Sequence, residues 1–133
     1  MRALIIDDEA GIGRVVARVA QSNGFTAQSA TDIATFQADF ARARPDAVFL
    51  DLQLGNEDGL GLLRFLADER YPCPVVLMSG YDERVLASAE RLGRDLGLEI
   101  FASINKPFRA EDLATLFDQL ALHLALSSDH PSP

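Results

Sequence analysis

Val48-Phe49-Leu50-Asp51-Leu52-Gln53-Leu54-Gly55 is the stretch from which the fold of this chain follows. Three apolar residues lead directly into one aspartate, and the turn-forming Gly55 and Asn56 come soon after. A short apolar run bounded by turn residues is typical of a strand buried in a parallel sheet. We therefore expect Asp51 at the carboxyl end of a central strand, where ligands bind in open α/β sheets. A lone aspartate there more often caps a turn, so a chemical role needs support from elsewhere in the chain.

Three further apolar runs also end in polar residues. Leu4-Ile5-Ile6 leads into Asp7-Asp8-Glu9, and Val75-Val76-Leu77-Met78 leads into Ser79-Gly80. The run from Ile100 to Asn105 leads into Lys106-Pro107-Phe108. Because ligands collect at the carboxyl edge of such a sheet, the sequence predicts that carboxylates, a hydroxyl and an ammonium meet there.

Segments with helical periodicity separate these runs. The expected strands are Ala3–Ile6, Phe25–Ser29, Ala47–Leu50, Val75–Met78 and one that starts at Ile100 and is closed by Pro107, and the expected helices start near Glu9, Thr31, Leu60, Tyr81 and Ala110. Phe25–Ser29 is the most polar strand and so an expected edge, Thr31 an expected N-cap, and Gly24 and Gly97 expected helix ends. Alternating strands and helices predict a doubly wound α/β sandwich.

Composition limits the class of protein. The chain has 133 residues, of which 48% are hydrophobic and 24% charged, as in one ordinary globular domain. No apolar run approaches the roughly 18 residues of a membrane span, and the single Cys73 suits a reducing cytoplasm. A net charge of −8 argues against nucleic-acid binding and favours a divalent cation near the acids.

Taken together, these residues resemble the receiver domain of two-component response regulators. The pieces that match are Asp7-Asp8-Glu9, Asp51 with Asp58-Gly59 downstream, Ser79-Gly80 and Lys106-Pro107-Phe108. The resemblance implies a flavodoxin-like sheet of strand order 2-1-3-4-5 in a three-layer sandwich. It covers residues 1–126 as the receiver domain, and leaves 127–133 as a flexible tail or truncated linker.

The resemblance also implies a chemistry. Asp51 accepts a phosphoryl group from a histidine kinase or histidine phosphotransfer protein, and positive charge is needed because one anion attacks another. In the family pattern the Mg²⁺ ligands, for which Mn²⁺ is a possible substitute, correspond to Asp7 (through water), Asp8, Asp51 and the backbone carbonyl of Gln53. Lys106 and Ser79 contact the phosphoryl oxygens, and Pro107 holds the lysine loop. The peptide before Pro107 is open to either isomer from sequence, and the resemblance favours cis.

Several positions depart from the family pattern. Ser103 stands where an aromatic switch residue is usual, so either Phe101, expected on the same strand face, or Tyr81 is a candidate substitute, unless the switch works without an aromatic. Gln53 and Tyr81 also flank the expected path of hydrolytic water. The long segment between Ser79 and Lys106 resembles receivers attached to EAL-type cyclic-di-GMP phosphodiesterases.

Other functions stay open at this point. A Mg²⁺-dependent phosphatase generally needs a second acid where Gln53 stands, which favours a non-enzymatic signalling module with self-catalysed phosphotransfer and slow autodephosphorylation. A receiver that works without phosphorylation fits the residues less well, because the set of acids, Ser79 and Lys106 is complete. A flavodoxin-like cofactor carrier also fits less well, since the loop after Ile6 lacks a phosphate-cradling run. We expect a partner, output-domain or homodimer surface at Asp82 to Arg94 with Arg109 to Asp112.

Overall fold

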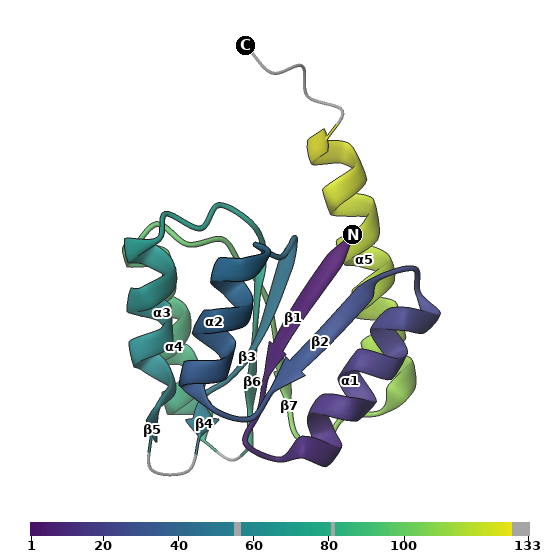
Figure 1. Ribbon diagram of the computed structural model, residues 1–133. Coiled ribbons are helices and arrows are strands. Elements are labelled where there is room, and N and C mark those ends of the chain that lie inside the picture. The colour runs from purple at the N-terminus through teal and green to yellow at the C-terminus, as the bar shows by residue number, and fades with distance from the viewer. Residues whose placement is uncertain (55–56, 81, 129–133) are drawn as a thin grey trace.

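Parallel strands alternate with helices along the chain in the computed structural model, which describes residues 1–54, 57–80 and 82–128 (Figure 1). The elements are β1 (Arg2–Ile6), α1 (Ala10–Ser22), β2 (Thr26–Ala30), α2 (Ile33–Arg42), β3 (Ala47–Asp51), β4 (Gln53–Leu54), β5 (Glu57–Asp58), α3 (Gly59–Asp68), β6 (Val75–Ser79), α4 (Glu83–Asp95), β7 (Ile100–Asn105) and α5 (Ala110–Ser128). No helix in these described ranges is long and apolar enough to cross a membrane.

The main sheet has the order β2-β1-β3-β6-β7, and every pair in it is parallel. This is the predicted 2-1-3-4-5 pattern, because β4 and β5 belong to a separate small sheet. β2 lies at an edge, as its polar sequence predicted. β3 and β6 are buried at every residue, which explains why they consist almost wholly of apolar residues.

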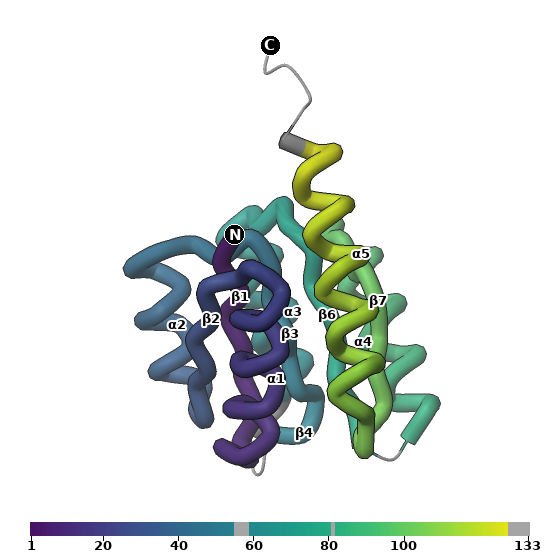
Figure 2. The backbone as a smooth tube through the Cα atoms, turned by 90° about the vertical axis from the view of Figure 1, so that its right-hand side faces the viewer, coloured from purple at the N-terminus to yellow at the C-terminus, as the bar shows by residue number. Residues whose placement is uncertain are grey.

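Helices cover both faces of the sheet (Figures 1 and 2). Successive side chains of a strand point to opposite faces, so Leu4 and Ile6 of β1 join the core under α2, α3 and α4. Ala3 and Ile5 join the core under α1 and α5. The three-layer sandwich predicted from the alternating elements is confirmed.

Helix ends follow local chemistry, with one correction. The N-cap of α2 is Asp32 rather than the predicted Thr31, because the Asp32 carboxylate accepts hydrogen bonds from the Thr35 backbone N–H (2.7 Å) and hydroxyl (3.0 Å). These bonds, the backbone one first, lower the pKa of Asp32. Gly24 (φ 86°) and Gly97 (φ 88°) take the left-handed conformation predicted past their helices.

A bulge in β7 changes which side chains face which helices. The register passes from Val75 opposite Ile100 to Val76 opposite Ala102, which leaves Phe101 as the extra residue. Phe101 packs with the α1–α5 core and against His123 of α5, with ring centroids 5.1 Å apart. The Ser103 hydroxyl instead donates to Glu90 Oε1 of α4 at 3.1 Å. The prediction that Phe101 shares the strand face of Ser103 is therefore wrong.

A short antiparallel pair, β4 with β5, follows the central strand and was not among the strands expected from the sequence. Gln53 lies opposite Asp58 and Leu54 opposite Glu57. Gly55 and the candidate switch residue Tyr81, both considered from the sequence, fall outside the described residues.

Candidate functional site

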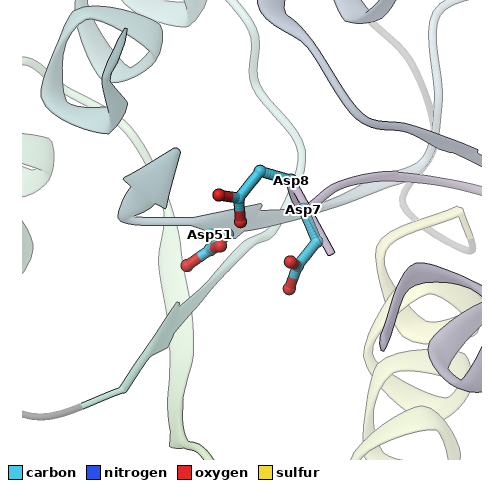
Figure 3. A group of neighbouring side chains, drawn as sticks. All are labelled: Asp7, Asp8 and Asp51. Carbon is cyan, nitrogen blue, oxygen red and sulfur yellow. The ribbon is translucent and has the colours of Figure 1, made fainter. Parts of the chain in front are cut away.

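Three carboxylates gather at the carboxyl ends of β1 and β3. Asp7 and Asp8 directly follow β1, and Asp51 is the last residue of β3 (Figure 3). One carboxylate oxygen from each of the three lies within 4.8 Å of the others. Asp7 and Asp51 are fully buried, whereas Asp8 is exposed. The acid group therefore has two enclosed members and one that faces solvent.

Lys106 brings the opposite charge to this group from the end of β7. Its Nζ lies 2.7 Å from Asp7 Oδ2 and 3.1 Å from Asp51 Oδ2, and its side chain is only 12% exposed. The Lys106 backbone N–H donates to the Ser79 carbonyl at 2.8 Å, which ties the lysine loop to β6. The Lys106–Pro107 peptide is cis, the isomer that the family pattern favours.

Each buried carboxylate uses its other oxygen to hold its own loop. Asp7 Oδ1 accepts the Glu9 backbone N–H at 2.9 Å, and Asp51 Oδ1 accepts that of Gln53 at 3.0 Å. Such side-chain turns two residues on are typical of aspartate. They leave Asp7 Oδ2 and Asp51 Oδ2 with no hydrogen bond in the described chain beyond their ion pairs with the ammonium.

Burial dominates the electrostatics of this site. It raises the pKa of Asp51 to about 6, with the nearby Asp7 adding to the rise, while the Gln53 N–H and Lys106 act in the opposite direction. Burial also works against the charged form of Lys106, but its contacts with Asp7 and Asp51 prevail and raise its pKa. The site thus holds more negative charge than one ammonium relieves.

Ser79 and two glycines shape the walls around Asp51. Ser79, at the end of β6, is 2% exposed. A Cβ on Gly59 would stand 2.9 Å from the carbonyl oxygens of Asp51 and Leu52, so only glycine allows α3 to begin this close to the acceptor strand. A Cβ on Gly80 would stand 2.6 Å from Gln53 Oε1. The Gln53 side chain therefore lies against the residue that follows Ser79.

The structure brings most of the predicted site together. Asp7, Asp8, Asp51 and Lys106 form one cluster, and Ser79 ends the strand next to β3. Phe101 lies apart, on the α5 side of the sheet. The Gly59 and Gly80 contacts were not predicted, because a glycine in a loop does not reveal which distant atom occupies its missing side chain.

The geometry suits a divalent cation. Mg²⁺ prefers oxygen ligands, and carboxylates that carry more negative charge than their partners neutralise are its usual setting in proteins. Asp7, Asp8 and Asp51 form the metal-compatible group found in the described residues, and the incompletely partnered Asp7 Oδ2 and Asp51 Oδ2 fit such a charge.

Comparison with known proteins identifies the family. The family model for the response regulator receiver domain matches residues 3–118. Nitrogen assimilation regulatory protein NtrX from Azorhizobium caulinodans is 34% identical in an alignment of 120 positions that covers 87% of this chain and 25% of that protein. Alkaline phosphatase synthesis transcriptional regulatory protein SphR from Synechococcus elongatus is 35% identical in an alignment of 123 positions that covers 84% of this chain and 45% of that protein.

A solved structure agrees. The receiver domain of NtrX from Brucella abortus superimposes with a TM-score of 0.77 at 30% identity, covering 89% of this chain and 96% of that one. The chain spans between a quarter and about half of the length of the two curated relatives. The sheet order, the acid cluster with its lysine and these matches agree: the chain belongs to the response regulator receiver domains, the signalling phosphoacceptors of two-component systems.

Proposed function

We propose that Asp51 is the residue of this receiver that accepts the phosphoryl group. A carboxylate oxygen of Asp51 attacks phosphorus, the bond from phosphorus to the histidine nitrogen of the donor breaks, and its electron pair stays on that nitrogen. The product is an acyl phosphate on Asp51. The observation that carries this assignment is the position of Asp51, buried at the end of β3 and 3.1 Å from the Lys106 ammonium.

Asp8, Asp51 and the Gln53 backbone carbonyl would hold the Mg²⁺, with Asp7 acting through water. The cation supplies the positive charge that lets one anion approach another. Mn²⁺, which also suits oxygen ligands, is an expected substitute. The supporting observations are the mutual approach of the three carboxylates and the exposure of Asp8, which leaves one side of the group accessible.

The Lys106 ammonium would pair with the phosphoryl oxygens once the phosphoryl group is on Asp51. Its ammonium already pairs with Asp7 and Asp51, so a short displacement brings it to an anion on Asp51. Ser79 would donate its hydroxyl to a phosphoryl oxygen, which draws the end of β6 inward. Pro107 would keep the lysine loop in position, and the bulk of Gln53 would affect the lifetime of the acyl phosphate.

We infer that the donor is a histidine kinase or a histidine phosphotransfer protein, in the cytoplasm, and that the chain is a signalling module rather than a turnover enzyme. Gln53 provides no acid two residues past Asp51, which supports this reading. The segment from Asp82 to Arg94, with Arg109 to Asp112, is the proposed partner surface. The EAL-type subfamily and the division into residues 1–126 and a tail stay predictions.

Intact-protein mass spectrometry tests the assignment. The chain is incubated with Mg²⁺ and acetyl phosphate, alongside an Asp51→Asn variant. An Asp39→Asn variant is the control, because Asp39 is a buried carboxylate of α2 that does not belong to the acid group. One added phosphoryl group on the wild type and on Asp39→Asn, absent from Asp51→Asn, supports the proposal. An equal adduct on Asp51→Asn would contradict it, and sustained release of phosphate in large molar excess would indicate an enzyme.

A further inference from the structure

The acid site, Asp7 with Asp51, lies on one particular face of the sheet. Ile5 of β1 and Phe49 of β3 both pack in the core under α1 and α5, and the two aspartates come two residues after them. Side chains two residues apart along a strand share a face. Both carboxylates therefore continue the face of the α1–α5 core to the carboxyl end of the sheet.

Lys106 reaches that face because β7 contains a bulge. Ile100, the first residue of β7, packs instead against the core under α2, α3 and α4, and counting in twos from Ile100 assigns Lys106 to this opposite face. Phe101 is the extra residue, and Phe101 and Ala102 follow one another in the α1–α5 core. Beyond the bulge the count is shifted by one, which puts Lys106 on the face of the acids, where its ammonium pairs with both.

Both ends of β7 are fixed to β6, so the extra residue must be held between them. The Val75 backbone N–H donates to the Glu99 carbonyl at 2.8 Å just before β7, and the Lys106 N–H donates to the Ser79 carbonyl at 2.8 Å just after it. A slip of one residue would move a side chain by about 3.3 Å along the strand and turn it to the other face. Either change would separate the ammonium from the carboxylates.

His123 of α5 contacts β7 and the residue before it on both sides of Ile100. Helix α5 packs alongside this strand (Figure 2), with the His123 ring centroid 5.1 Å from that of Phe101. Its Nε2 lies 2.6 Å from Glu99 Oε1. Since the His123 and Glu99 side chains are 36% and 39% exposed, their pairing contributes little to stability by itself. What it fixes is the position of the chain where the bulge begins.

We propose that His123 and Phe101 are positioning residues, which set the register of β7 and thereby hold Lys106 against Asp7 and Asp51. Neither residue touches the reacting atoms, and both act through the lysine. The consequence for phosphoryl transfer rests on the proposed function, in which the Lys106 ammonium pairs with the phosphoryl oxygens. The consequence for the ion pairs of Lys106 does not, and it can be measured separately.

Phosphorylation rates test whether His123 acts through Lys106. The full chain is incubated with Mg²⁺ and acetyl phosphate, and the initial rate of phosphoryl addition is measured by intact-protein mass spectrometry. His123→Ala should lower this rate by about tenfold, because a small displacement of a group that contacts the transition state has a large effect. In a Lys106→Met background, His123→Ala should lower the slower rate no further.

Conservative and control variants separate this geometry from a general loss of stability. His123→Phe keeps a ring beside Phe101 and His123→Gln keeps a polar group toward Glu99, so each should retain more of the rate than His123→Ala. Phe101→Ala should act like His123→Ala, since it removes the same contact. Phe25→Leu weakens the same core beside the opposite edge strand, through its ring contact with Phe117 at 5.2 Å, and should leave the rate unchanged.

Urea unfolding without Mg²⁺ or acetyl phosphate tests the register independently of phosphoryl transfer. Effects of substitutions at sites that share no contact normally add. If His123 holds Lys106 in place, Lys106→Met should shift the unfolding midpoint less when His123→Ala is already present. With Phe25→Leu in place of His123→Ala, the two shifts should add.

A rate loss that depends on Lys106, together with less-than-additive midpoints, supports the proposal. A wild-type rate in His123→Ala, a loss that persists in the Lys106→Met background, or additive midpoints for His123 and Lys106 would each overturn it. If the wild type itself accepts no phosphoryl group, the assignment of Asp51 fails, and the midpoints alone decide whether His123 positions the lysine.

Discussion

Strands β1 and β3 differ from β7 in how regularly their side chains alternate between the two faces of the sheet. At β1 and β3 the alternation of side chains is unbroken, so Asp7 and Asp51 lie where a count along the strand predicts. In β7 one extra residue, Phe101, shifts the count, and the face that it occupies is opposite to the predicted one. A single inserted residue thus decides which helix receives an aromatic side chain, while the acid site is unaffected.

The largest expected effect comes from removing the cation at the strand ends. Lys106→Met leaves two buried carboxylates without their ammonium, and breaking a buried pair this way costs about 3 kcal/mol of unfolding free energy. Urea denaturation at neutral pH, without divalent cations, measures it. Arg109→Met is the matched control, since its ion pair with Glu111 is exposed and contributes little. Equal stabilities for the two variants would show that the buried ion pairs of Lys106 contribute no more to stability than the exposed ion pair of Arg109.

Gly59→Ala tests the close approach of α3 to the acceptor strand. The new Cβ would stand 2.9 Å from backbone atoms of Asp51 and Leu52, and we expect a loss of about 2 kcal/mol because backbone cannot move aside cheaply. Gly61→Ala is the control, because nothing lies within 4 Å of its Cβ, and it should be neutral or stabilising. The difference between the two midpoints of unfolding in urea is the measurement, and similar midpoints would contradict the packing argument.

The pH dependence of stability tests the buried Asp51. Its pKa is about 6 in the folded protein against an ordinary 3.8, so the folded state binds the extra proton between these values and loses stability as pH rises through them. Asp51→Asn removes that loss. The variant should be more stable than the wild type above pH 6 without divalent cations, with the gain disappearing near pH 4. A gain that is the same at both pH values would show that it has another cause.

The smallest expected effect concerns the bulge. Phe101→Ala should cost about 1 kcal/mol, and a double-mutant cycle with His123→Ala should give a coupling of roughly 0.5–1 kcal/mol, because the two rings are in contact. The same cycle with Glu90→Ala should give none, since Glu90 contacts Ser103 on the other side of the sheet. Coupling to Glu90 instead of His123 would place Phe101 on the face that the simple count predicts.

The corrections concern where single elements begin and how they pair, and the surrounding chain decides both. Thr31 and Asp32 are both good N-caps, and only the path of the chain into α2 selects the second. The bulge at Phe101 and the β4–β5 pair each depend on how one strand meets its neighbour, which the strand's own residues do not encode. Pairing register is a property of two segments together, so a reading of one segment at a time misses it.

The sequence by itself determined the order of the elements and the residues of the acid site, while the strand order of the sheet followed from the resemblance to receiver domains. It could do so because buried parallel strands must be apolar, which makes the polar residues at their ends conspicuous. Only the tertiary structure decided how Lys106 divides between Asp7 and Asp51, why position 59 must be glycine, and which face Phe101 occupies. Each of these depends on distances between segments far apart in the chain, and such distances exist only once the layers have packed.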